Sequence, residues 1–142
     1  MQNQTRRTAL KILGTSCAAI SLPLKLSGFE PTPVKPIRLG VIADLHGGLA
    51  TDADSRLDQF LNSMAKQKVD ALVQLGDFAY PNQKHQRFSD KFNAAHENTV
   101  HVIGNHEFDF GLGRKNCFQA WGIESAYYQR DIGEIRILVL DG

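Results

Sequence analysis

The chain has 142 residues, enough for one domain of ordinary size, and 42% of them are apolar while 22% are charged. This composition excludes a disordered chain, which would have fewer apolar residues and a larger net charge. The net charge of +1 produces no long-range field for nucleic acid or an anionic membrane, so we expect neither as a partner.

The N-terminus has the pattern of an export signal. A basic start containing Arg6 and Arg7 leads into a moderately apolar stretch, 12–24, which is too short for a stable membrane span. The paired arginines resemble a twin-arginine signal, although Ala9 stands where a bulkier apolar residue is usual. We therefore expect residues 1–30 to be a signal peptide and linker, read by the twin-arginine translocation machinery, and the protein to be periplasmic or extracellular. An amphipathic first helix of the domain is the alternative.

A proline-rich linker at 30–36 precedes the folded domain, which we place at 36–142. The hydrophobic pattern beyond it predicts alternating strands and helices. The expected elements are a strand at 37–43, a helix at 55–67 with Leu57, Phe60, Leu61 and Met64 on one face, a strand at 69–75, a helix at 83–97, a strand at 99–103, a helix at 114–121 closed by Gly122, and a hairpin at 127–140. This order indicates an α/β fold with parallel strands, in which ligands collect at the carboxyl ends of the strands.

Each of the three expected parallel strands ends in polar side chains that suit a metal ion. Asp44 and His46 follow the first strand, and in extended backbone they would point the same way. Asp77 follows the second strand, and Gly-Asn-His-Glu at 104–107 follows the third. Carboxylate, imidazole and amide ligands without thiolates suit Mn, Fe or Zn in a site other than a structural zinc site.

Asp-x-His, Gly-Asp and Gly-Asn-His-Glu in this order resemble the first part of the calcineurin-like metallophosphoesterase signature. The resemblance runs from residue 37 to 142, and the stretch 111–142 is similar to the Tat-exported bacterial branch of that family. It implies the N-terminal part of an αββα sandwich with a mixed sheet. It also implies two divalent or trivalent metal ions and a small phosphate-ester substrate.

The resemblance assigns metal ligands to four of these side chains. Asp44 and His46 would bind the first metal ion, and Asp77 would bridge both ions. Asn105 would bind the second ion and lie near the phosphate. Two metal ions lower the pKa of a bound water and neutralise phosphate charge, which is most of what phosphoryl transfer requires.

The resemblance assigns catalytic roles to the two residues that follow. His106 would contact the substrate and help to protonate the leaving oxygen, and Glu107 would orient His106. The family pattern continues with another His and a Gly-His-x-His motif, neither of which follows Glu107 here. We therefore expect an N-terminal fragment that holds part of a dinuclear site, and weak or no turnover by residues 36–142 alone.

Several of the same side chains also have structural interpretations. His85 and His96 are expected on the solvated face of a helix, and His101 is expected to pack inside the domain. Asp44 and Asp77 could each cap a helix, since Asp is common there. For three aromatic residues a core or hairpin role is favoured over a substrate-stacking surface: Trp121, Tyr127 and Tyr128.

The function predicted from these patterns is hydrolysis of phosphoric esters by an exported, metal-dependent enzyme. Two alternatives stay open. One is a phosphodiesterase or nucleotide pyrophosphatase of the same superfamily. The other is an inactive truncated remnant that binds metal or a partner.

Overall fold

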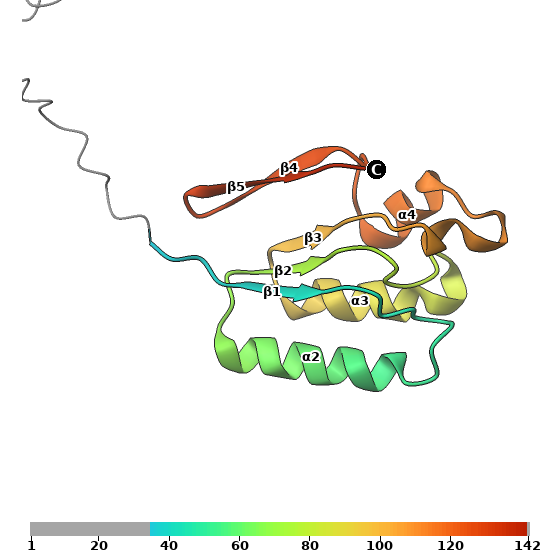
Figure 1. The fold of residues 1–142 in the computed structure, drawn as a ribbon, viewed down its shortest axis with the longest axis horizontal. Helices are drawn as coiled ribbons and strands as arrows, with labels where there is room; N and C mark the ends of the chain where they lie inside the picture. The colour runs from blue at the N-terminus through green and yellow to red at the C-terminus, as the bar shows by residue number, and fades with distance from the viewer. Residues whose placement is uncertain (1–34, 142) are drawn as a thin grey trace, which may run out of the picture. The chain divides into compact units, whose positions relative to one another are not determined.

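The central element of the computed structural model, which describes residues 35–141, is a three-stranded parallel sheet (Figure 1). Its strands are β1 (Leu39–Ile42), β2 (Ala71–Gln74) and β3 (Thr99–His101), in the order β1-β2-β3. Leu72 of β2 pairs with Gly40 on one side and with Thr99 on the other. The predicted α/β fold with parallel strands is confirmed. The expected signal peptide lies outside the described residues.

Helices α2 (Ala53–Gln67) and α3 (Gln86–Ala95) cover one face of this sheet (Figure 1). The apolar stripe predicted for α2 faces the core: Leu57 is fully buried, and Phe60, Leu61 and Met64 pack beside it. A short 3₁₀ helix, η1 (Gln83–His85), precedes α3 and divides the single helix expected there. Within 35–141, no helix is both long enough and apolar enough to cross a membrane.

The core between sheet and helices also holds residues from the loops that follow β1 and β2. Leu45 comes from the first loop and Phe78 from the second, and both are buried against Phe88 and Phe92 of α3. Phe78 meets Phe92 edge to face, with ring centroids 5.1 Å apart. Burial of these apolar side chains fixes the two loops, and with them the polar residues on either side.

A β-hairpin of β4 (Tyr128–Ile132) and β5 (Ile135–Val139) lies on the opposite face of the sheet (Figure 1). Val139 packs on Val73 and Val100 of the parallel strands. Among the described strands, β4 and β5 pair only with each other, so the expected mixed sheet is present here as two separate sheets.

Helix α4 (Arg114–Trp121) has the predicted bounds and ends at Gly122, whose φ of 69° is left-handed. It follows η2 (His106–Gly111), a 3₁₀ segment with a kink at its last residues. Trp121 is buried, as the core interpretation predicts, and stacks on His101 with ring centroids 5.5 Å apart. Tyr128 is also structural, because its hydroxyl bonds the backbone N and O of His101. Tyr127 is 62% exposed.

The prediction that His85 and His96 face solvent is wrong. His85 is only 8% exposed, and its Nδ1 lies 2.9 Å from Asn82 Oδ1. His96 is half-buried, with Nε2 3.1 Å from the Val69 carbonyl oxygen. The helical pattern could not show this, because Gly48 lies against the His85 ring and Val69 bonds His96, and both come from other parts of the chain.

A buried polar network surrounds His101 and fixes its tautomer. The Gln74 Oε1 accepts the Gly76 amide at 2.7 Å, so its Nε2 is the donor to the Val102 carbonyl at 3.0 Å and to His101 Nδ1 at 3.3 Å. His101 Nε2 then carries the proton, which it donates to Asn93 Oδ1 at 2.7 Å. If His101 Nδ1 were also protonated, its N–H would face the N–H of Gln74 Nε2, and two donors cannot form a hydrogen bond with each other.

The stability of the fold should consequently fall in acid through His101. Burial, with Arg130 nearby, lowers the pKa of His101 from 6.5 to about 4. The folded state holds the neutral His101 ring, so the contribution of His101 to the free energy of unfolding is complete above pH 6.5 and is lost as the pH falls toward 4. The loss approaches about 3 kcal/mol in the free energy of unfolding. Urea unfolding at pH 7 and pH 4.5 measures it.

The matched variant is His101→Asn, which has no titrating group. It should be less stable at pH 7 but should lose less stability between the two pH values. An equal loss in both proteins would contradict this role for His101.

Candidate metal centre

The loops that follow β1 and β2 stay side by side beyond the sheet. The His46 amide donates to the Asp77 carbonyl at 2.9 Å, and the Gly47 amide donates to the Phe78 carbonyl at 2.8 Å. The segment after β3 joins them, since the His106 amide donates to Asp77 Oδ1 at 3.0 Å. Three distant parts of the chain therefore meet at the carboxyl edge of the sheet, where such ligands were expected.

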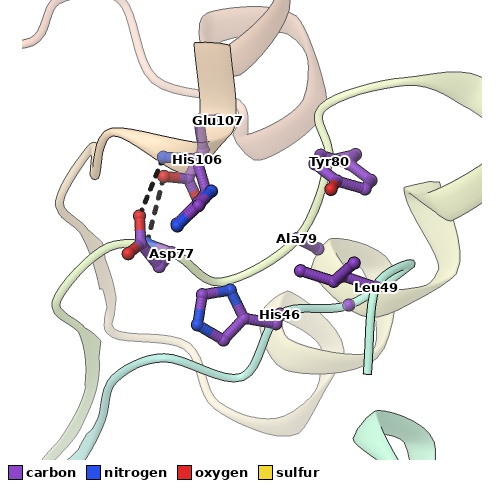
Figure 2. A pocket seen from close by; sticks show the side chains of 8 residues that line it. His46, Leu49, Asp77, Ala79, Tyr80, His106 and Glu107 are labelled. Carbon is purple, nitrogen blue, oxygen red and sulfur yellow. Dashed lines mark hydrogen bonds between the residues drawn. The ribbon is translucent and has the colours of Figure 1, made fainter. Parts of the chain in front are cut away.

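Three side chains converge closely at this edge. Ligand atoms of His46, Asp77 and His106 all lie within 4.8 Å of one another (Figure 2). The two imidazole rings are nearly perpendicular, with centroids 5.1 Å apart. The Asp77 carboxylate and the His46 imidazole fit a divalent ion at this spacing, because ligand bonds to Zn are about 2.0–2.2 Å long. The His106 imidazole lies beside that position. The donor set equally suits Mn and Fe.

Asp44 lies at the same edge but outside that close group of carboxylate and imidazole ligands. The Asp44 Oδ1 is 3.9 Å from His46 Nε2, and its side chain is 70% exposed. Asn105 is exposed, immediately precedes His106, and makes no side-chain bond to the start of η2. Of the expected metal ligands, the structure therefore brings His46 and Asp77 together, leaves Asp44 more exposed beside them, and places Asn105 next to His106 in the chain.

Three of the expected metal ligands have left-handed backbone. Asp44, His46 and Asp77 have φ values of 53°, 54° and 50°. The extended geometry expected for Asp44 and His46 is therefore wrong, because β1 ends at Ile42 and the chain then turns. Left-handed backbone costs a non-glycine residue about 1–2 kcal/mol, so the packed loops must compensate for it.

Glu107 holds this turn in place rather than orienting His106. It is 1% exposed, and its Oε1 accepts the Phe78 amide at 2.6 Å. Its Oε2 accepts the amides of Asp77 at 3.0 Å and Gly104 at 2.8 Å. Burial raises the pKa of Glu107, and the three amide donors oppose that shift. A side chain on Gly104 would collide with Asp77, so the close approach requires glycine.

Asp109 is the residue that orients His106. Its Oδ2 lies 2.9 Å from His106 Nδ1, and this hydrogen bond is the main reason that the pKa of His106 is raised above 6.5. Sequence reasoning missed Asp109. The available signal was its spacing of three residues from His106, which brings side chains together in a helical turn.

Replacing Asp109 by asparagine should lower the pKa of His106 in the metal-free protein, because the carboxylate that favours the imidazolium is lost. An NMR titration of the His106 ring protons measures the shift. Asp131→Asn is the matched control, since Asp131 pairs with Arg136 on the hairpin. An unchanged His106 pKa in Asp109→Asn would contradict this role.

Residues 37–142 match the family model described as calcineurin-like phosphoesterase. The crystal structure of a dimetal phosphatase from Danio rerio is similar at 22% identity and a TM-score of 0.44, over 58% of this chain and 33% of that one. The chain thus corresponds to about a third of that protein's length. No match was found among curated protein sequences.

Proposed function

Because the chain belongs to the calcineurin-like phosphoesterase family, we propose that it supplies the metal-binding edge of a metal-dependent phosphoric ester hydrolase. The observation that carries this proposal is the convergence of His46, Asp77 and His106 from three loops. Asp77 is the natural bridging ligand, because it lies between the other two loops and its own backbone is fixed by Glu107.

Asp44, His46, Asp77 and Asn105 would hold two metal ions. When bound, such ions neutralise the phosphate and lower the pKa of the attacking water. The residues of the chain contribute positioning: the left-handed turns and the Glu107 hydrogen bonds set the ligand carboxylate before any substrate arrives.

His106 is proposed to act on the leaving group. Asp109 occupies its Nδ1, so Nε2 is the free ring nitrogen. The hydrogen bond to Asp109 raises the pKa of His106 above that of a free imidazole, which favours its protonated form. Its Nε2–H can then be given to the leaving oxygen as the phosphorus–oxygen bond breaks.

Metal titration and a substrate panel test the proposal together. We expect saturable binding of Mn²⁺ by calorimetry. We also expect hydrolysis of p-nitrophenyl phosphate that is weak in this chain, depends on Mn²⁺ and stops with a chelator. Both should be lost in His46→Ala and kept in His96→Ala, whose histidine lies away from the cluster.

The other outcomes identify the alternatives. Preference for bis-p-nitrophenyl phosphate or a nucleotide diphosphate would indicate a phosphodiesterase or pyrophosphatase. Weak binding of one metal ion without turnover would indicate a non-catalytic remnant. No saturable metal binding at all would contradict the proposal.

Export through the twin-arginine pathway is part of the same proposal. Arg6 and Arg7 before the apolar stretch 12–24 support it. A reporter fused after residue 36 should reach the periplasm of a bacterial host, and Arg6→Lys with Arg7→Lys should retain it in the cytoplasm. Equal export of both fusions would contradict this pathway.

A further inference from the structure

An apolar rim stands opposite the metal-binding side chains. We define it by Leu49, Tyr80 and Phe110. We infer that this rim binds a planar aromatic leaving group of a phosphate monoester. The inference rests on the proposed function and adds the substrate class.

Leu49 and Tyr80 of the rim enclose one small pocket with the metal-binding side chains, and Phe110 adjoins it through its contact with Tyr80. Asp77 and His106 line one side of it, and Leu49 and Tyr80 line the other (Figure 2). The space enclosed for water-sized groups is only about 10 Å³, roughly the room for one water. Bound metal would take up this space, so the organic part of a substrate must lie in the open mouth beside the rim.

Phe110 is the most exposed of the large apolar side chains noted in the part of the chain that the structure describes. It is 86% exposed, and its φ of 59° and ψ of 27° are left-handed. Exposure of the apolar ring to water costs free energy, and so does the left-handed backbone. Residues with strained backbone are common at binding sites. Phe110 follows Asp109, which bonds His106, so the ring is tied to the metal-binding edge.

Tyr80 connects this ring to the body of the domain. Tyr80 contacts Phe110 edge to face, with ring centroids 5.3 Å apart. It also contacts the buried His85, with ring centroids 5.7 Å apart. Leu49, 60% exposed, adds aliphatic surface to the same pocket wall. The rim thus offers apolar surface that Tyr80 anchors to the buried His85, and such a surface suits a flat aromatic group. Aromatic contacts of this kind change affinity by about 2- to 10-fold.

A pair of non-hydrolysable probes tests the rim without relying on turnover. Phenylphosphonate and methylphosphonate share the phosphonate group and differ in the aromatic ring. We expect calorimetry on the full chain loaded with Zn²⁺ to show phenylphosphonate binding several-fold more tightly. In Phe110→Ala that ratio should fall toward one, while methylphosphonate affinity stays unchanged.

Two further variants isolate the ring. Phe110→Asn removes the ring but tolerates left-handed backbone, so it should behave like Phe110→Ala if the ring itself is what binds. Leu138→Ala removes another exposed apolar side chain, on the β4–β5 hairpin, and should leave the ratio unchanged.

The outcomes separate this inference from the proposed function. Equal affinity for both probes, or a ratio that Phe110→Ala leaves intact, overturns the rim and leaves the metal-dependent hydrolase standing. Failure of the Zn²⁺-loaded chain to bind either phosphonate overturns both.

Discussion

Asp77→Asn is expected to lower the affinity for Mn²⁺ by more than about 100-fold and to remove metal-dependent hydrolysis. Loss of a residue that only supports a metal ligand costs about 10- to 100-fold, and loss of the central charged ligand should cost more. The asparagine oxygen can still accept the His106 amide that Asp77 Oδ1 accepts at 3.0 Å, so the turn should persist. Calorimetric titration with Mn²⁺ measures the change.

The control for Asp77→Asn is Asp58→Asn. Asp58 pairs with Lys91 between the exposed faces of two helices, at 2.8 Å, and removing it makes the same change in net charge. Surface pairs of this kind contribute about 0–1 kcal/mol, so the control should fold and bind metal as the parent does. Equal Mn²⁺ affinity in Asp77→Asn and Asp58→Asn would remove Asp77 from the metal centre.

Glu107→Ala is expected to destabilise the fold by at least about 3 kcal/mol. It leaves the amides of Asp77, Phe78 and Gly104 without their acceptor, and an orphaned buried donor costs about 1–3 kcal/mol. Urea unfolding at pH 7 measures the free energy of unfolding. Glu107→Gln should lose less stability, since the amide oxygen still accepts a hydrogen bond.

Glu97→Gln is the control for this pair, because Glu97 is exposed at the end of the α3 segment. We expect a change within about 0.5 kcal/mol for such a surface substitution. If Glu107→Ala unfolds at the same urea concentration as Glu97→Gln, the buried carboxylate does not hold the turn.

The parts of the fold that depend on local pattern were predictable from the sequence. The 3.6-residue spacing of Leu57, Phe60, Leu61 and Met64 identifies α2, and Gly122 marks the end of α4. The edge that carries the site was predictable as well, because parallel strands place their carboxyl ends together.

The geometry within the site was not predictable, because it depends on contacts between distant segments. Nothing local to Asp44 or His46 signals left-handed backbone, which glycine usually provides. Glu107 binds amides 29 and 30 residues away in sequence, at Phe78 and Asp77, so its role appears only once the loops are packed. Burial of His85 has the same origin.

The left-handed turns at Asp44, His46 and Asp77 create a trade-off between the thermal stability of the protein and its affinity for metal ions. Glycine is the residue that such backbone accepts without strain, so Asp44→Gly or His46→Gly relaxes about 1 kcal/mol while deleting a proposed metal ligand, whereas Asp77→Gly also loses the hydrogen bond from the His106 amide. A laboratory screen that rewards heat resistance alone would therefore enrich glycine at positions 44 and 46 and select, step by step, a sturdier protein that binds metal ions more weakly.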